Sequence, residues 1–573
     1  MTAVQEQRLA SYAQFNQQLL QAIMTSFSAG EPAAWTGIAR SLMSGENQDS
    51  SEWLEIHERY YRRQWELCTR MLKSGEERRP VIEPEAADRR FRAPEWGEQP
   101  YFDYLKQSYL LYSRWLNEMA EASTLDSKAK SRLKFFLRQY IDSMAPGNFP
   151  ATNPEVQKLA AETQGESLAL GLRNLTRDIE KGRISMSDED AFEVGRNLAI
   201  TPGAVVFENE LIQLIQYSPL SDQAYERPLL IVPPCISKFY VLDLQPESSF
   251  VRHCLEQNHT VFLISWRNAP VELGGITWDD YLSEGVLAAL DVALAITKAD
   301  KANTLGFCVG GVLLACALAL LAARDQRLAS SMALLASMLD YELSGELGML
   351  IDESFVLSRE AQFKNGGVVH GKEINLIFSS LRANEFIWHY VINNYLKGKP
   401  PDAIDLLYWT GDQSNLPGAM YTYYIRNLYL ENKLMRPGAL SMCGTPVDLG
   451  SINVPTYVLA AREDHISPWK CAYASARLLK GAVEFVLAAG GHVAGVINPP
   501  ARNRRNYWVN QLADDPEQWL AAAESRAGSW WTHWSTWLKP RSGKLVPSRS
   551  KLGNDQYREI EPAPGKYVKV RDA

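Results

Sequence analysis

The sequence lacks the features of a nucleic-acid-binding, secreted or low-complexity protein. Its 573 residues are 46% hydrophobic and 22% charged, with a formal net charge of −8 and no low-complexity tract, as in globular proteins. Arginine and lysine are scattered, whereas a nucleic-acid binder normally presents a basic face, so we expect no nucleic-acid partner. The N-terminal MTAVQEQRLASYAQF has no basic region followed by an apolar core, so no secretory signal is expected.

Cysteine is sparse, and its spacing excludes two common uses. The seven cysteines, an odd number, form neither a CxxC pair nor a disulfide framework. They are Cys68, Cys235, Cys254, Cys308, Cys316, Cys443 and Cys471. This usage fits a reducing cytoplasm, where a thiol stays free for chemistry, and we expect a cytoplasmic protein.

Cofactor-binding motifs are also absent from the sequence. It contains no Walker loop, no GxGxxG unit followed by an acid, and no His/Cys cluster at metal-ligand spacing. The Gly490-Gly491-His492 stretch is too short to be a nucleotide loop. We therefore expect chemistry that uses neither a cofactor nor a metal.

One long apolar run raises the question of a membrane span. Leu305 to Ala323 carries no charge and is almost long enough to cross a bilayer. Three glycines fall near its start and a strand-like segment precedes it, so a buried strand, a turn and a helix explain the run better. No transmembrane span is expected.

The chain changes character near residue 200. Residues 1–200 predict an α-helical domain, with patterned stretches at 11–24 and 101–120 and a charged, proline-containing connection at 74–100. Over 201–573, short apolar runs alternate with helical stretches, which predicts a mainly parallel sheet with flanking helices. The expected strands are 227–234, 260–266, 303–307, 331–337, 455–461 and 483–489.

The interval at about 340–445 breaks this alternation. It contains no convincing sheet strand and is rich in aromatic residues, as in EFIWHYVINNYL and AMYTYYIRNLYL. An insertion of this size between two sheet strands predicts a cap over the active site. Most of its aromatic side chains are expected to pack in the core of the cap itself.

The sequence Gly306-Phe307-Cys308-Val309-Gly310 stands directly after a predicted strand and before a predicted helix. This is the nucleophile-elbow pattern of α/β hydrolases with Cys in place of Ser. Glycines are needed because the turn is sharp, and side chains there would collide with the neighbouring strand and helix. The elbow would expose the Cys308 sulfur at a helix N-terminus, where a thiolate is favoured.

Such an elbow requires an acid and then a histidine, each in a loop beyond a later strand. Glu463 and Asp464 follow the strand at 455–461, and His492 follows the strand at 483–489. We predict Cys308, Asp464 and His492 as the nucleophile, acid and base. Glu463 stays an alternative acid, because spacing barely separates the two.

The oxyanion hole is expected to combine two backbone N–H groups. One belongs to Val309, directly after the nucleophile. The other comes from the loop at 233–238, where Ile236 is the best candidate. These features together predict an α/β-hydrolase fold with a cap insertion, preceded by an α-helical N-terminal domain.

A thiol nucleophile suits exchange with a thioester, because the acyl group moves from one sulfur to another at little free-energy cost. The acyl-enzyme then stays reactive enough to pass the acyl group to an alcohol. The elbow therefore favours an acyl-CoA donor and a hydroxyl acceptor.

Longer segments carry a more specific resemblance. They include LLIVPPCISKFYVLDLQPESSFVRH, HTVFLISWRN, LGFCVGG, YWTGD, VPTYVLAAREDHISPW and GGHVAGVINPP. Together they resemble class I polyhydroxyalkanoate synthases, densely over about 200–573 and more loosely through DRRFRAPEW and the helices after it. The chain departs from the family pattern at Ser237, where asparagine is usual.

The resemblance implies an enzyme that polymerises short (R)-3-hydroxyacyl-CoA, such as 3-hydroxybutyryl-CoA, into polyester with release of CoA. It implies that Cys308 carries the growing chain, that His492 activates the thiol, and that Asp464 assists attack by the substrate's 3-hydroxyl. The CoA thioester is then a substrate and not a cofactor. The resemblance also implies a homodimer at the surface of cytoplasmic polyester granules, with granule-associated proteins as further partners.

Several single positions add to the resemblance. Phe307 and Val309 within the elbow favour class I, whose preferred monomers are short. Ala494 matches a position linked to substrate preference in the family. Trp409 and Asp412 lie in a motif linked to dimer contacts.

Two other functions stay open from the sequence. A Cys-type hydrolase or thioesterase on the same fold would pass the acyl group to water and give free acid, whereas a synthase gives polymer. A granule-coating structural protein would carry a degenerate active site, and the complete Cys–Asp–His set argues against it.

Overall fold

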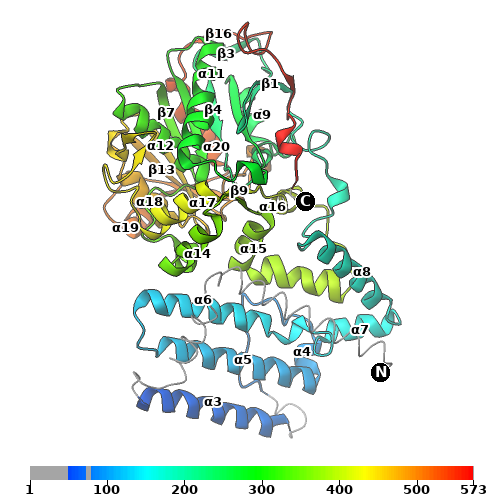
Figure 1. Ribbon diagram of the computed structural model, residues 1–573. Coiled ribbons are helices and arrows are strands. Elements are labelled where there is room, and N and C mark those ends of the chain that lie inside the picture. The colour runs from blue at the N-terminus through cyan, green and yellow to red at the C-terminus, as the bar shows by residue number, and fades with distance from the viewer. Residues whose placement is uncertain (1–49, 72–78, 572–573) are drawn as a thin grey trace. The chain divides into compact units, whose positions relative to one another are not determined.

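The computed structural model describes residues 50–71 and 79–571, which form two compact units. The first unit comprises the described residues up to Asp188 together with Leu376–Asp402. The second comprises Glu189–Asn375 and the described residues from Ala403 onward. Figure 1 shows the mainly helical first unit and the second unit, which contains the large sheet.

The first unit is built from helices. They include α3 (Ser50–Met71), α4 (Glu95–Glu98), α5 (Pro100–Glu121), α6 (Ser127–Ser143), α7 (Pro154–Glu162) and α8 (Glu166–Lys181). Helix α5 confirms the helix predicted at 101–120; its side chains Phe102, Tyr109 and Leu111 are buried. The stretch predicted as helical at 11–24 lies outside the described residues.

A segment from much later in the sequence completes this unit. Leu376–Asp402 includes the end of α15 (Gly371–Leu381) and two π-helical stretches, η7 (Asn384–Trp388) and η8 (Val391–Leu396). It falls inside the interval that the sequence predicts to be a cap, yet it belongs to the unit of the N-terminal helices. The cap and the domain boundary near residue 200 stay predictions.

Helix α8 and the η8 stretch pack closely within the first unit. A Cβ atom on Gly171 would overlap the carbonyl oxygen of Tyr395, so only glycine fits there. The Tyr395 hydroxyl donates a hydrogen bond to the buried Asp178 carboxylate at 2.6 Å. Packing of this kind, and not position in the sequence, assigns the segment to this unit.

The second unit is built around an eleven-stranded sheet in the order β15-β14-β13-β12-β7-β6-β4-β5-β2-β1-β17. The six strands from β13 to β5 in this order run parallel to one another. They confirm the six predicted strands as β4 (Leu229–Val232), β5 (Val261–Trp266), β6 (Ala302–Phe307), β7 (Ala329–Leu335), β12 (Thr456–Ala461) and β13 (Val483–Ala488).

Antiparallel strands, which the sequence did not predict, extend the sheet on both sides. They are β1 (Gly203–Glu208), β2 (Ile212–Tyr217), β14 (Asn506–Val509), β15 (Glu524–Ala527) and β17 (Glu561–Pro562). Strand β17 pairs with β1, Ala204 with Pro562 and Val205 with Glu561. The C-terminal part of the chain is thus held at one edge of the sheet.

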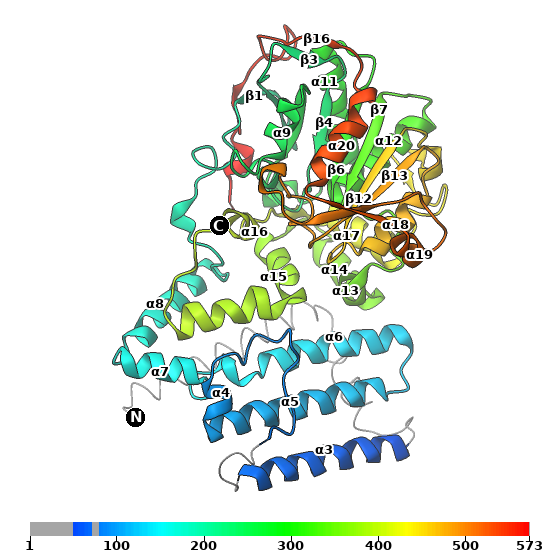
Figure 2. The same ribbon diagram turned by 180° about the vertical axis from the view of Figure 1, so that it is seen from behind.

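Helices cover both faces of the sheet. α11 (Ala288–Thr297) and α12 (Val309–Ala323) lie on the face seen in Figure 1, and α9 (Phe250–Glu256) and α20 (Trp530–Leu538) lie on the face seen in Figure 2. The last two helices share a core, in which the Phe250 ring contacts the rings of Trp530, Trp531 and Trp534.

The long apolar run forms the end of β6, a turn and helix α12, as predicted. Every residue of α12 from Val309 to Leu321 is buried, which explains why this stretch needs no charge. In the part of the chain that the structure describes, no helix is long and apolar enough to cross a bilayer.

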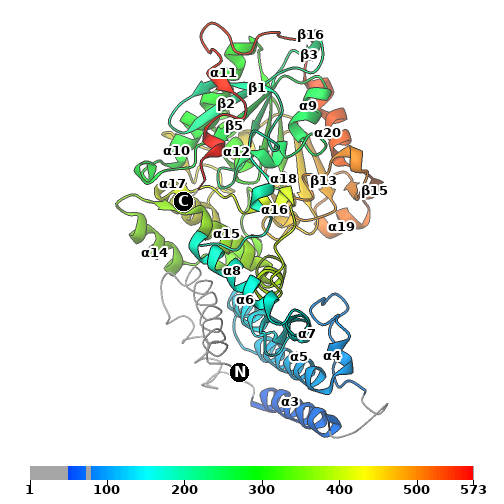
Figure 3. The same cartoon turned by 90° about the vertical axis from the view of Figure 1, so that its right-hand side faces the viewer.

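The remaining elements of the second unit are short. Between β7 and β12, none joins the main sheet, as predicted, and α16 and α17 lie along one end of it (Figure 3). They are α13 (Gly345–Leu350), α14 (Glu353–Phe363), β8 (Val368–Val369), α16 (Asp405–Thr410), β9 (Leu416–Pro417), α17 (Gly418–Tyr424), η9 (Ile425–Leu430), β10 (Ser441–Met442) and β11 (Thr445–Pro446). Elsewhere lie β3 (Gln223–Tyr225), η4 (Phe239–Asp243), α10 (Trp278–Asp280), η6 (Tyr281–Leu287), α18 (Trp469–Arg477), α19 (Pro516–Ala521) and β16 (Leu545–Pro547).

Candidate active site

Cys308 occupies a sharp turn between strand β6 and helix α12. Its backbone has φ 53° and ψ −128°, a left-handed conformation that non-glycine residues rarely adopt. Its N–H donates to the Leu335 carbonyl at 2.9 Å, and its own carbonyl accepts from the Ser337 hydroxyl at 2.9 Å. The neighbouring strand therefore holds the strained residue, as nucleophile elbows require.

The glycines of the elbow are needed for its packing. A Cβ atom on Gly306 would overlap Gly311, and one on Gly310 would overlap the carbonyl oxygens of Val232 and Pro233. The start of α12 thus presses against the end of β4. This contact brings the loop after β4 next to the nucleophile.

The structure brings the predicted acid and base together. Asp464 lies in the loop after β12 and His492 in the loop after β13, and both are buried. The His492 Nδ1 atom is 2.7 Å from Asp464 Oδ2. Asp464 Oδ1 accepts the backbone N–H groups of Ile466 and Ser467, each at 2.8 Å. Both oxygens of this carboxylate therefore have donors.

The His492 ring links Asp464 to Cys308. It stacks on the Phe307 ring, with centroids 5.5 Å apart, and interacts with the Cys308 side chain. Burial opposes a charged ring, but the Asp464 carboxylate and Cys308 outweigh it and hold the pKa of His492 well above its usual range. The ring is thus arranged to accept and keep a proton.

Glu463, the alternative acid, points elsewhere. Its carboxylate accepts the backbone N–H of Gly490, and its own N–H donates to the Gly490 carbonyl at 3.0 Å. Glu463 therefore ties the two loops together, whereas Asp464 contacts His492. The geometry favours Asp464 as the acid of the set.

The two predicted oxyanion donors flank the elbow. Val309 begins α12, and the first N–H groups of a helix have no acceptor inside the helix. Ile236 is half-buried in the loop after β4, and its carbonyl accepts the N–H of Ser414 at 3.1 Å. The neighbouring Cys235 is fully buried. Burial raises the pKa of its thiol, and the nearby Cys308 adds to the effect. The role of Val309 and Ile236 as oxyanion donors stays a prediction.

Three tyrosines near Cys308 were missed by the sequence analysis; Tyr341 is buried, and Tyr424 and Tyr429 are half-buried. The Tyr341 and Tyr424 hydroxyls are 3.2 Å apart, and the Tyr429 ring packs 4.7 Å from that of Tyr341. Burial raises the pKa of all three well above the ordinary value, and the nearby Cys308 adds to the effect. The only sequence signal was the aromatic content of 418–430.

Three other predicted positions lie in the second unit. Ala494 is half-buried in the loop after His492, where its carbonyl accepts from Arg505 at 2.7 Å. Trp409 and Asp412, which the resemblance links to dimer contacts, are 6% and 5% exposed. The Trp409 indole donates to the Lys238 carbonyl at 2.7 Å, so these two side chains are engaged within their own chain.

Among the described residues, no group of three or more His, Cys, Asp or Glu side chains is arranged to hold a metal ion. The set that the site does offer is a thiol close to an imidazole, which is hydrogen-bonded to a carboxylate. Such a set can activate the thiol as a nucleophile and take up an acyl group.

A nucleophile elbow with its acid and base beyond later strands of a mainly parallel sheet defines a protein of the α/β-hydrolase superfamily. Residues 228–499 match the family model described as alpha/beta hydrolase fold, which confirms the predicted fold class. Residues 87–254 match the model for the N-terminus of poly-beta-hydroxybutyrate polymerase (PhaC).

Full-length relatives specify the family. The chain is 51% identical over 490 residues to the poly(3-hydroxyalkanoate) polymerase subunit PhaC of Cupriavidus necator, covering 84% of this chain and 83% of that protein. It is 39% identical to the Rhizobium meliloti protein of the same name, with 84% and 80% covered. The chain therefore belongs to the poly(3-hydroxyalkanoate) polymerase family, as the resemblance predicted. It is an acyltransferase that makes polyhydroxyalkanoate by polymerisation.

Among solved structures, the chain is similar to a monoacylglycerol lipase of Paleococcus ferrophilus. That match has 11% sequence identity and a TM-score of 0.34, and covers 58% of this chain and 99% of the lipase. At that score the match adds nothing to what the strand order shows.

Proposed function

We propose that the protein transfers (R)-3-hydroxyacyl groups from CoA to the thiol of Cys308, and from there to the hydroxyl of a growing polyester. The observation that carries the proposal is a thiol in a strained elbow, close to a histidine that is itself hydrogen-bonded to a buried aspartate. Exchange between a thiol and a thioester is nearly balanced in free energy, and the resulting acyl-enzyme stays reactive.

In the first step, His492 accepts the proton of Cys308 and the sulfur attacks the carbonyl carbon of the acyl-CoA. Negative charge develops on the carbonyl oxygen, towards which the N–H groups of Val309 and Ile236 donate. The bond between the carbonyl carbon and the CoA sulfur then breaks, and CoA leaves as a thiol with the proton from His492. Asp464 stabilises the charged ring meanwhile.

In the second step, the hydroxyl of another hydroxyacyl unit attacks the thioester on Cys308. An ester bond forms, the carbon–sulfur bond breaks, and the hydroxyl proton ends on the Cys308 sulfur. Because both Asp464 oxygens already accept hydrogen bonds, we propose that Asp464 assists this attack through His492. His492 then serves as base in both steps, and no cofactor takes part.

We propose that the preferred substrates carry short acyl chains. Phe307 and Val309 match the class I elbow, and Ala494 stands two residues after His492. One methylene in an apolar pocket shifts discrimination by about 1–3 kcal/mol, so Ala494→Leu should change the ratio of C4 to C6 units in copolymer made from mixed hydroxyacyl-CoA. An unchanged ratio in a folded, active variant would remove Ala494 from chain-length selection.

The proposal also includes a place in the cell and an assembly. We propose that the enzyme works in the cytoplasm at the surface of polyester granules, as a homodimer with granule-associated proteins as partners. The resemblance to class I synthases supports this. Fractionation of cells that make polyester should find the protein with the granules, and a purely soluble distribution would contradict it.

Incubation with 3-hydroxybutyryl-CoA tests the proposed chemistry. CoA release together with rising turbidity indicates a synthase, whereas CoA release with free acid and no turbidity indicates a hydrolase or thioesterase. Cys308→Ala should abolish both signals. A Cys308→Ala variant that still supported granule formation alone would favour a granule-coating structural role.

A further inference from the structure

A buried ion pair lies close to the proposed oxyanion loop. The Lys238 Nζ atom is 3.0 Å from Asp412 Oδ1, and each side chain is only 3% exposed. Asp412 Oδ2 also accepts the Tyr240 hydroxyl at 2.9 Å, and Lys238 Nζ donates to the Val570 carbonyl at 2.6 Å. Charges this deeply buried persist only when they are paired and hydrogen-bonded, so the pair fixes the segments that carry it.

The segments joined by this pair include the loop of Ile236. Besides the bond from Ser414 N–H to the Ile236 carbonyl, Ser237 forms a backbone bridge with Gln413. One residue further on, the Lys238 carbonyl accepts the Trp409 indole. Residues 236–238 are thus bonded at each position to residues 409–414.

The C-terminal tail is the third partner. Beyond β17 it is anchored at the sheet edge, where the Gln213 side-chain oxygen accepts the N–H groups of Lys566 and Tyr567 at 3.1 and 3.2 Å. The described tail then runs to a point beside α16 (Figures 1 and 2). There, in addition to the Val570 carbonyl on Lys238, the Arg571 guanidinium is 3.8 Å from Asp412 and 4.4 Å above the Tyr408 ring.

We propose that Lys238, Asp412 and the tail at Val570–Arg571 form a clamp that positions the loop after β4, and with it the N–H of Ile236, for stabilisation of the oxyanion. These are positioning residues, since they act through the loop. The inference rests on the proposed function, in which Ile236 donates to the developing negative charge. The clamp also gives a role to a lysine that is buried in this unit.

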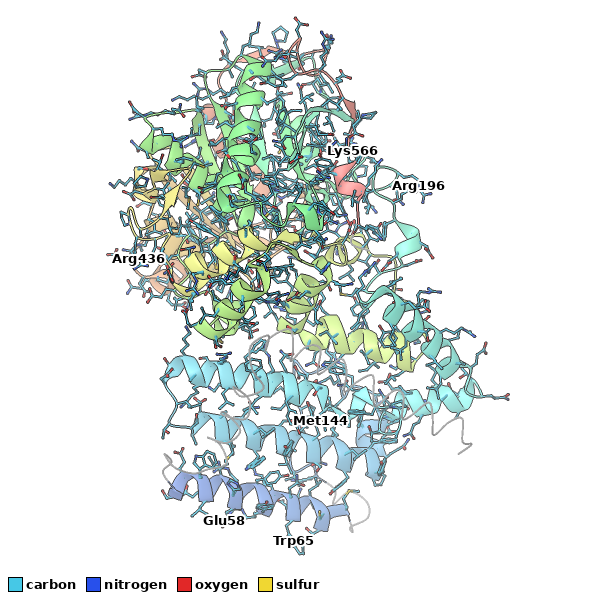
Figure 4. The ribbon with its side chains drawn as sticks, viewed as in Figure 1. Glu58, Trp65, Met144, Arg196, Arg436 and Lys566 are labelled. Atoms are coloured by element: carbon cyan, nitrogen blue, oxygen red, sulfur yellow. The ribbon has the colours of Figure 1, made fainter. Side chains whose placement is uncertain are left out.

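The test uses two different ways of opening the clamp. Lys238→Met removes the buried cation at nearly constant length, and a chain that stops after Lys569 removes the Val570 carbonyl and Arg571. The matched controls are Lys566→Met and a chain that stops after Arg571. Lys566 lies on the same tail but is exposed, in a surface ion pair with Glu208 (Figure 4).

Two rates are measured at Cys308 in each variant: acylation by 3-hydroxybutyryl-CoA, and alkylation by iodoacetamide followed by mass spectrometry of the Cys308 peptide. Acylation needs the oxyanion hole, but alkylation does not. Because loss or displacement of one oxyanion donor costs about 10²-fold, acylation should fall by roughly that factor in both clamp variants, with KM changed less than about threefold. Alkylation and both controls should stay near wild type.

The outcomes separate the inference from the proposed function. Acylation within about threefold of wild type in the folded clamp variants overturns the clamp. An equal fall of acylation and alkylation also overturns it, because the pair would then support the whole site and not the loop. If the wild-type enzyme itself shows no acylation by the CoA thioester, the proposed function fails, and the clamp fails with it.

Discussion

At the scale of single residues, the proposed acyl-enzyme depends on Cys308. An oxoester on serine would be less reactive towards an alcohol than a thioester on cysteine. The surroundings of Cys308 support this use of the thiol: a ring that holds a proton firmly on one side and the start of helix α12 on the other. These surroundings support the proposed transfer of the acyl group from CoA to Cys308 and then to an alcohol.

Cys308→Ser should keep the fold and nearly abolish turnover. The oxygen is a poorer nucleophile in this site and gives a less reactive intermediate, so CoA release should fall by on the order of 10³-fold or more. CoA release with 3-hydroxybutyryl-CoA, at matched circular dichroism, measures the effect. Turnover close to wild type would rule out a mechanism that depends on the thiol.

The raised pKa of His492 predicts a pH-dependent contribution to stability. A group whose folded pKa lies above its unfolded value of about 6.5 stabilises the fold fully below that value, and loses this contribution as the pH rises through the folded pKa. The difference in unfolding free energy between wild type and His492→Gln should therefore be larger at pH 6 than at pH 9. Asp464→Asn should reduce this pH dependence. A difference that grows with pH would have the wrong sign.

Motif order alone predicted Cys308, Asp464 and His492, because each follows a strand end. The sequence could not exclude Glu463, since only the fold shows that its carboxylate turns to the Gly490 N–H. The tyrosine pair could not be predicted either. Tyr341 and Tyr424 are 83 residues apart, and no local period connects them.

At the scale of elements, the site depends on how closely β4, β6 and α12 approach one another. Glycines 306, 310 and 311 allow backbone to touch backbone at the elbow. The same contact places the loop after β4 beside Cys308. A change at one of these glycines is therefore expected to act on stability and on the proposed oxyanion hole together.

Gly310→Ala should destabilise the protein and lower its activity. The new Cβ would overlap two backbone carbonyls, which cannot move away as a side chain could. The loss of unfolding free energy should therefore be about 1–3 kcal/mol, as is typical of overpacking, or more. Urea unfolding and CoA release measure the two effects. Gly275→Ala is the matched control, because no atom lies within 4 Å of a Cβ there. Equal stability of the two variants would contradict the close packing.

The parallel strands were predictable because each is a short, mainly buried apolar run next to a helical stretch. The outer, antiparallel strands could not be predicted from the sequence. Strand β2 is fully buried but reads IQLIQY, because its glutamines are buried as hydrogen-bond acceptors of the tail, so the sequence shows no apolar run there. Strand β17 has only two residues, and its partner β1 is more than 350 residues earlier.

At the scale of the whole molecule, the chain divides into two units that are not continuous in sequence. The pattern of apolar residues predicts that a helix exists, but not which core it joins. For this reason Leu376–Asp402 could not be assigned to the helical unit before the structure was known. The burial of Trp409 could not be predicted either, because the resemblance links its motif to dimer contacts.

Trp409→Ala should destabilise the second unit by about 3–5 kcal/mol, as expected for a large buried side chain. Trp65→Ala is the control: Trp65 is 73% exposed on α3 (Figure 4), and its loss should cost at most about 0.5 kcal/mol. Urea unfolding gives the stabilities, and sedimentation gives the state of association. Weaker association of Trp409→Ala at unchanged stability would place Trp409 at an interface between copies.

The most direct test of the central claim is the mass of the Cys308 peptide after brief mixing with 3-hydroxybutyryl-CoA and an acid quench. The account predicts peptides that contain Cys308 and carry one or more hydroxybutyryl units. The matching Cys308→Ala peptide should carry none, and His492→Gln should show strongly slowed labelling. Polymer formation with no acyl group on Cys308, or with the acyl group on another residue, would contradict the account.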